Sequence, residues 1–171
     1  MATSFLRFAD VELAAEPLVI GYLRRRNIRT LEPEANTMGY DLLCRARRRV
    51  RSARFSEVRV QVKSRYQADC DRTVPVKKST LREFDFLVIV FLNIGRFGHG
   101  KDGSTGARDP EVFTLTAGLA RKLFQDKPKW SKVSLRGVET KLERCKGEQG
   151  FEQIAKALGI PRPLRPVAPT R

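Results

Sequence analysis

The sequence predicts an α/β domain built around a mixed central β-sheet, and three stretches carry that prediction. Apolar residues recur at helical spacing over about residues 9 to 26. Residues 57 to 65 alternate between apolar and polar side chains, which is the period of a strand with one buried face. Residues 84 to 93 form the most apolar run of the chain, and its β-branched content is typical of a central strand buried on both faces.

The opening helix is predicted from apolar side chains three and four residues apart, with Asp10 as its N-terminal cap. Pro17 falls in the middle of the pattern and leaves two interpretations open, a kink at Pro17 or a helix that begins near residue 16. Basic residues at 24 to 26 suit the C-terminal end of the helix dipole. The apolar positions are Val11, Ala14, Ala15, Leu18, Val19, Tyr22 and Leu23.

Three strands are expected after this helix. Residues 28 to 31 are expected to form a short edge strand, and a loop from Glu32 leads to Gly39. Residues 40 to 46 and 57 to 65 are then predicted to form the next two strands.

The second half of the chain is expected to complete the sheet and cover it. Asp85 should lie where the apolar strand begins, and Asn93 to Asp109 should be a glycine-rich loop. The further predicted elements are a short strand with Val74 and Val76, a strand at 111 to 116, a helix from Ala117 to about Gln125 capped by Thr116, a short strand near Trp130 and Val133–Leu135, and helical segments at Val138–Cys145 and Phe151–Leu158 separated by Gly147 and Gly150.

These elements predict a single domain over residues 1 to 160. A chain of 171 residues can bury an adequate core in one domain. Residues 161 to 171 are rich in proline and arginine without a helical or strand pattern, and we expect them to be a disordered basic tail.

The formal net charge of +15, from 34 Lys and Arg against 19 Asp and Glu, indicates a polyanionic partner. A scaffold protein of the ribosomal kind would also carry such a charge. A membrane surface is disfavoured because no basic segment has an extended apolar face. Three widely spaced cysteines without a CxxC pair predict neither a zinc site nor a disulfide framework, and no apolar run is long enough to cross a bilayer, so we expect a cytoplasmic protein.

Two neighbouring predicted strands are expected to bring three polar side chains to one edge of the sheet. Asp41 opens the first strand, and Gln61 and Lys63 share one face of the second. A hard cation such as Mg²⁺ takes oxygen ligands and needs only one or two carboxylates, and a lysine beside it can orient water and offset charge on a phosphate. The three side chains therefore indicate metal-dependent phosphodiester hydrolysis. Glu57, on the same face, is the acid that could replace Gln61.

Asp41 followed by Gln61-Val62-Lys63 resembles the signature of the PD-(D/E)xK nuclease superfamily, which has the restriction-endonuclease-like fold. In that pattern an Asp opens one strand of a hairpin and an acid-x-Lys triplet lies on the next. This chain carries Gln61 where Asp or Glu is usual, as some homing endonucleases and resolvase-like proteins do. The resemblance covers about residues 9 to 93 and implies a restriction-endonuclease-like core, a mixed central sheet flanked by helices.

The resemblance also implies a role for each residue. Asp41 would be the main ligand of Mg²⁺, or of Mn²⁺ in its place, Gln61 a neutral ligand or water holder, and Lys63 the catalytic lysine. The backbone carbonyl of Val62 would be a further ligand. An acid on the first helix often completes such a site. Here Glu16 matches better than Glu12, although both also suit an early helical turn at the surface.

The predicted turn between these strands is strongly basic. Neighbouring arginines repel one another unless something negative lies between them, which favours a phosphate-contacting loop over a solvated hairpin tip. Guanidinium groups also suit bidentate phosphate contacts. The candidate DNA-binding residues are Arg45, Arg47, Arg48, Arg49, Arg51 and Arg54 of this turn, together with Arg65, Lys77 and Lys78.

A second motif imitates a phosphate-binding loop. Gly95 to Lys101 satisfies the GxxxxGK pattern after an apolar strand. Asp102 follows where Ser or Thr should hold Mg²⁺, and the next residues, to Pro110, cannot begin the required helix. We therefore expect no nucleotide hydrolysis there, and we expect His99 to be exposed to solvent rather than catalytic, with DNA contact as an open alternative.

Two functions remain open on the sequence. The first is a Mg²⁺-dependent DNA endonuclease, and the second is a DNA-binding relative in which Gln61 has removed metal binding and catalysis. Cutting both strands of a duplex usually needs two sites, so a homodimer is a hypothesis for the first function.

Overall fold

A mixed five-stranded sheet forms the centre of the computed structural model, which describes residues 11–33, 39–47, 53–65, 72–93, 109–127 and 131–161. The strand order is β1-β2-β3-β5-β6. β1, β2 and β3 are antiparallel neighbours, β5 runs parallel to β3, and β6 is antiparallel to β5. The strands are β1 (Ile28–Leu31), β2 (Leu42–Ala46), β3 (Glu57–Arg65), β5 (Phe86–Phe91) and β6 (Glu111–Thr116).

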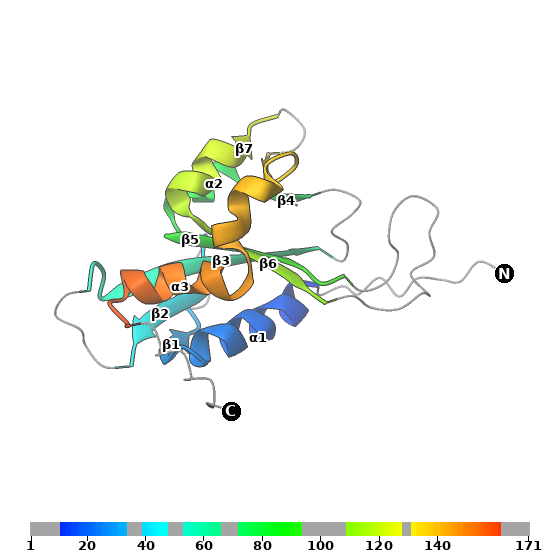
Figure 1. Cartoon of the computed structure of the whole chain (residues 1–171). Helices are drawn as coiled ribbons and strands as arrows, with labels where there is room; N and C mark the ends of the chain where they lie inside the picture. Colours follow the sequence, from blue (N-terminus) through cyan, green and yellow to red (C-terminus); the bar gives the residue numbers. More distant parts are fainter. Residues whose placement is uncertain are drawn as a thin grey trace, which may run out of the picture.

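Helices and a small second sheet cover the two faces of this sheet. In Figure 1, α1 lies below the sheet and α2 lies above it. The small sheet has the strand order β4-β8-β7. These elements are α1 (Val11–Arg24), β4 (Thr73–Pro75), the 3₁₀ helix η1 (Lys78–Arg82), α2 (Ala117–Leu123), β7 (Phe124–Gln125), β8 (Lys132–Ser134), the 3₁₀ helix η3 (Glu139–Cys145) and α3 (Gly147–Ala157). The predicted α/β class with a mixed central sheet is confirmed.

The central strand β5 separates two hydrophobic cores. All six of its residues are buried, as the apolar run predicted. Val88 and Val90 belong to the core under α1 and α3, whereas Leu87 and Ile89 belong to the core under α2, η1 and β8. Asp85 lies at the start of this strand, as expected, and its backbone carbonyl accepts a hydrogen bond from the Ala117 N–H group at 2.8 Å.

The first helix runs through Pro17 without interruption, so the alternative start near residue 16 is wrong. Proline removes one backbone donor and therefore one helical hydrogen bond. Pro17 itself is exposed. The helix ends at Arg24, and the chain turns through Asn27, whose φ of 57° is in the left-handed region that Asn tolerates. Asp10, the expected cap, is outside the described residues.

Two predictions near the C-terminus are corrected. The helix after Thr116 ends at Leu123 because Phe124 and Gln125 pair with β8, although Thr116 caps it as expected by accepting the Leu119 N–H at 3.2 Å. Gly150 does not separate two segments but lies inside α3. A Cβ atom there would overlap the carbonyl oxygen of Cys145, so close packing rather than helix breaking explains this glycine.

Several expectations fall outside the described residues. They concern the Gly95–Lys101 loop with His99, the side chains of Glu12 and Trp130, and most of the basic tail. Among the residues that the structure does describe, no helix is long and apolar enough to cross a membrane.

Candidate functional site

The β2–β3 hairpin positions Asp41 beside the middle of β3, as expected if the two strands pair. Leu42 lies opposite Val60 in the antiparallel register, and the Asp41 N–H group donates to the Val60 carbonyl at 2.9 Å. The Asp41 carboxylate accepts a hydrogen bond from the Val62 N–H group at 2.6 Å. Side chain and backbone of Asp41 are thus both fixed to the strand that carries Gln61 and Lys63.

A glycine makes this placement possible. Gly39 has a φ of +100°, a conformation that other residues rarely adopt. A Cβ atom at this position would overlap the side chain of Glu83, which follows η1. The chain therefore needs glycine here on two grounds, and the turn that begins at Gly39 brings Asp41 to the start of β2.

Gln61 is the most unusual side chain of the site. Only 7% of it is exposed, and its Oε1 atom has no hydrogen-bond partner among the described residues. A buried polar atom without a partner costs about 1–3 kcal/mol. Its strand neighbour in the parallel register is Leu87, which offers no polar group. An oxygen held in this way, one strand from the Asp41 carboxylate, has the chemistry of a cation ligand.

Lys63 and Val62 continue β3 beyond Gln61. Lys63 is half-buried and points to the same sheet face as Gln61, because side chains two residues apart in a strand share a face. Val62 points to the opposite face and is 3% exposed in the core under α1. Its N–H group is held by Asp41, and the expected role of its carbonyl as a ligand stays a prediction.

The first helix packs on the face of β3 formed by Val58, Val60 and Val62. Glu16 lies on this helix directly after the buried Ala15 and is itself half-buried. Its expected role as a metal ligand stays a prediction. Within the described ranges, no group of three or more His, Cys, Asp or Glu side chains is gathered to hold a metal ion. A cation at this site would therefore rely on Asp41, the Gln61 amide oxygen and backbone oxygens.

Glu57 does not replace Gln61. It lies at the start of β3, where its carboxylate is 2.8 Å from the Arg45 guanidinium group. It lies four positions before Gln61 in the strand, or about 13 Å. The acid considered from the sequence therefore belongs to a cross-strand ion pair at the other end of the hairpin.

The expected DNA-binding residues divide into paired and exposed groups. Arg45 is paired with Glu57, and Lys78 with Asp126 at 2.6 Å. The hydrogen bond to Asp126 raises the pKa of Lys78. Arg54 is exposed and lies 5.2 Å from the ring centre of Phe55. Arg47 and Lys77 are exposed, Arg65 is half-buried at the end of β3, and Arg48, Arg49 and Arg51 are outside the described residues.

The sequence interpretation missed one polar contact that shapes this face. The Asp85 carboxylate accepts the Arg59 backbone N–H at 2.8 Å and lies 3.3 Å from its guanidinium group. The hydrogen bond to Asp85 raises the pKa of Arg59. This pair fixes the start of β5 to β3, two residues before Gln61. Arg59 and Asp85 are far apart in the sequence, so no local sequence pattern could have predicted that they pair.

None of the known protein-family models matches this chain, and a search of curated proteins found none that is significantly similar. Fold and site therefore define the protein as an α/β chain with a polar cluster of Asp41, Gln61 and Lys63 on a central hairpin. What that cluster does has to be inferred from its chemistry.

Proposed function

We propose that this protein is a Mg²⁺-dependent DNA endonuclease that hydrolyses phosphodiester bonds, with Mn²⁺ as a substitute metal. The observation that carries the proposal is the buried Gln61 amide oxygen without a partner, on the same face as Lys63 and directly before Val62, whose N–H group binds the Asp41 carboxylate. Apolar side chains would fill this part of the sheet at lower cost if it were only structural. A polar group that is kept at such a cost is typical of a functional site.

The residues present fit a hard divalent cation. Asp41 supplies one charged oxygen, and Gln61 supplies a neutral oxygen that would lose its desolvation penalty on binding. The hydrogen bond from the Val62 N–H group, at 2.6 Å, fixes the orientation of the Asp41 carboxylate beside β3. When bound, Mg²⁺ would polarise the scissile phosphate and offset the charge that builds on it.

Lys63 contributes the second half of the chemistry. Its ammonium group can donate to the attacking water or to a phosphate oxygen, which orients the water and stabilises the more negative transition state. Lys63 lies two residues beyond Gln61 in the strand, about 7 Å between Cα atoms, which suits a lysine that reaches a phosphate held by the metal ligands. The side chain is half-buried, which strengthens its interaction with that phosphate.

Two broader observations support the same function. An opening helix, a hairpin with the polar cluster and a following buried strand is the arrangement implied by the resemblance to PD-(D/E)xK nucleases. The net charge of +15 suits a polyanionic substrate. A homodimer for double-strand cutting and a cytoplasmic location, where the free thiols of Cys44 and Cys145 would stay reduced, belong to the proposal.

A non-catalytic DNA-binding protein is the second candidate. The observation that favours it is the neutral Gln61, because one carboxylate alone binds Mg²⁺ weakly. This candidate binds DNA with an affinity that falls steeply with salt, but it cuts no substrate with any metal.

The experiment that decides between them is nicking of supercoiled plasmid with Mg²⁺ or Mn²⁺, compared with EDTA. We expect nicking by the wild-type protein and by a Lys122→Ala control on the exposed face of α2, and none by Lys63→Ala or Asp41→Asn. Mn²⁺ binding followed by electron paramagnetic resonance reports the metal site without cleavage, and Asp41→Asn should abolish it. Absence of both nicking and Mn²⁺ binding, on plasmid and on branched DNA, would overturn the nuclease in favour of the binding protein.

A further inference from the structure

An open pocket of about 550 Å³ lies along the outer edge of β1, away from Asp41. Four consecutive residues of the edge strand and its preceding turn line it, together with one residue from α1 and one from the end of β2. No lining residue is acidic. We call it the β1-edge pocket; it is lined by Arg24, Asn27, Ile28, Arg29, Thr30 and Arg47.

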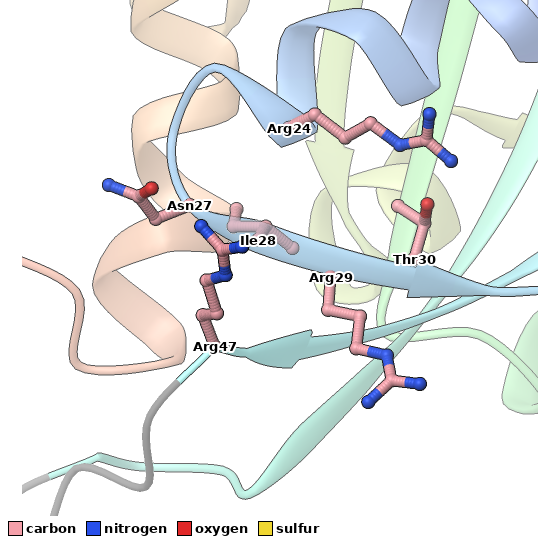
Figure 2. Close-up of a pocket in the computed structure, with 6 residues that line it drawn as sticks. All are labelled: Arg24, Asn27, Ile28, Arg29, Thr30 and Arg47. Atoms are coloured by element: carbon pink, nitrogen blue, oxygen red, sulfur yellow. The ribbon is translucent and has the colours of Figure 1, made fainter.

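Three arginines approach this pocket from three different elements. Figure 2 shows the Arg24 side chain extending from the end of α1 on the same side of β1 as the Thr30 hydroxyl group. Arg47 rises from the end of β2 towards Asn27 and Ile28, and Arg29 extends on the other side of β1. Positive charge therefore lies on both sides of one edge strand. This arrangement suits an extended polyanion better than a single compact anion.

These arginines differ from others in the described part of the chain. Arg25 and Arg26 lie against Glu148, Arg59 against Asp85, and Arg72 against Glu111. No carboxylate of the described residues lies within ion-pair distance of Arg24, Arg29 or Arg47. Three like charges that gather without a counter-charge repel one another, and a bound anion would remove that cost.

Part of the pocket, at Arg29, shares a face of the sheet with the polar cluster. Arg29 is opposite Arg45 in the β1–β2 register, and Leu43 is opposite Arg59 in the β2–β3 register. Strand alternation from these pairs puts Arg29 on the same face as Gln61 and Lys63. Arg47 lies six residues along from Asp41, about 20 Å, and one DNA strand advances about 3.4 Å per nucleotide. The two sites are therefore about six nucleotides apart.

We propose that the β1-edge pocket binds the sugar–phosphate backbone of a DNA strand about six nucleotides from the phosphate held at Asp41, Gln61 and Lys63. The inference rests on DNA as the ligand of the proposed function. Guanidinium groups donate in a planar fork that matches phosphate oxygens, and Asn27 and Thr30 add neutral donors. The contact is independent of base sequence and fixes the position of the backbone.

A second copy of this chain is a poorer occupant of the same edge. Unpaired edge strands often pair with one another, and a twofold contact between two β1 strands would bury the edge. Such a contact would also bring six arginine side chains of the two copies together, and no residue that lines the pocket is acidic. A homodimer of the proposed nuclease should therefore form through another surface.

Binding of an end-labelled duplex of about 20 base pairs, measured by fluorescence anisotropy in EDTA over a range of salt, tests the pocket without cleavage. The variant is Arg24→Gln/Arg29→Gln/Arg47→Gln. The control Lys122→Gln/Arg136→Gln/Lys141→Gln removes the same charge from exposed positions elsewhere. We expect the pocket variant to lose about tenfold or more in affinity near 0.1 M salt, and its salt slope to fall by about 2 to 3, since each lost phosphate contact removes about 0.9.

The outcomes separate this inference from the proposed function. If the pocket variant binds as tightly as the control variant, the pocket is not a DNA contact, whether or not the wild-type protein nicks plasmid. If the pocket variant loses affinity while the wild-type protein fails to nick, the pocket stands and hydrolysis fails. Circular dichroism checks that the triple variant is folded. If it is not, single substitutions of Arg24 and Arg47 should each lower the DNA affinity by a smaller factor.

Discussion

Replacing Gln61 by Leu should make the protein more stable and inactive. The Oε1 atom is buried without a partner, which costs about 1–3 kcal/mol in the metal-free protein. Leucine removes this cost and packs beside Leu87, its neighbour in the register. After allowance for the different side-chain shape, we expect a gain of about 1–2 kcal/mol in the free energy of unfolding in EDTA. With a slope near 2 kcal/mol per M, the urea midpoint rises by about 0.5 to 1 M.

The effect of Mg²⁺ on the free energy of unfolding is a second test of the same variant. At a Mg²⁺ concentration about tenfold above its dissociation constant, binding stabilises the folded protein by about 1.4 kcal/mol. The wild-type midpoint should therefore rise with Mg²⁺, whereas that of Gln61→Leu should not move. Urea unfolding followed by circular dichroism, with and without Mg²⁺, measures both effects, and plasmid nicking measures activity.

Gln61→Glu is the matched control, because it restores the acid that the resemblance expects. In EDTA, burial and the nearby Asp41 would raise the pKa of this carboxyl group in the folded state. A carboxyl with a raised folded pKa binds more protons when folded, so stability falls as pH rises above about 4.3. Mg²⁺ should reverse that loss. Destabilisation by Gln61→Leu in EDTA, or wild-type nicking by it, would refute the argument.

Three further outcomes are expected from the structure. Gly39→Ala should destabilise the protein by about 1–3 kcal/mol and abolish nicking, because φ of +100° and the Glu83 contact exclude a Cβ atom. Gly21→Ala, on the open face of α1, should instead stabilise the protein by about 0.5–1 kcal/mol, and urea midpoints compare the two variants. Burial alone would raise the pKa of Glu111, but hydrogen bonds from Arg72 and Lys146 lower this pKa below its usual value near 4.5. The free energy of unfolding should therefore fall as pH drops through the lowered pKa. In urea titrations at several acid pH values, a Glu111→Gln variant should lose less stability than the wild-type protein. Burial raises the pKa of Cys44 to about 12. Its thiol should therefore resist a colourimetric disulfide reagent at pH 8 until urea unfolds the chain. Rapid labelling of Cys44 in the folded protein would contradict this.

The strands were predictable because their side chains follow a local rule. Alternation of apolar and polar side chains predicts β3, and an unbroken apolar run predicts β5. A turn at Gly39 predicts where the hairpin begins. Gly150 is predicted to separate two helical segments, yet it lies inside α3, where only glycine fits against the carbonyl oxygen of Cys145. That requirement comes from two elements packed together, and no window of sequence contains it.

The candidate site also has a part that local sequence patterns predict and a part that depends on packing between elements. Asp41, Gln61 and Lys63 could be grouped because strand period and hairpin pairing fix which side chains share a face. The state of the Gln61 oxygen could not be predicted, since it depends on what surrounds it from β5. The β1-edge pocket could not be predicted, because Arg24, Arg29 and Arg47 are separated in sequence: Arg24 is expected at the end of the opening helix and Arg47 in the basic turn, and no sequence pattern joins them.

Net charge alone misrepresents where this protein can bind a polyanion. Several arginines are used internally: Arg26 holds Glu148 beside the Phe151 ring, and Arg72 lies between Glu111 and the rings of Phe91 and Phe113. Charges neutralised in this way contribute little to the field at the surface. Arg24, Arg29 and Arg47, which have no carboxylate partner among the described residues, lie at the β1 edge, and Arg29 shares the sheet face of Gln61 and Lys63. The distribution of partners, rather than the count of basic residues, therefore sets the direction in which a DNA strand should cross the sheet.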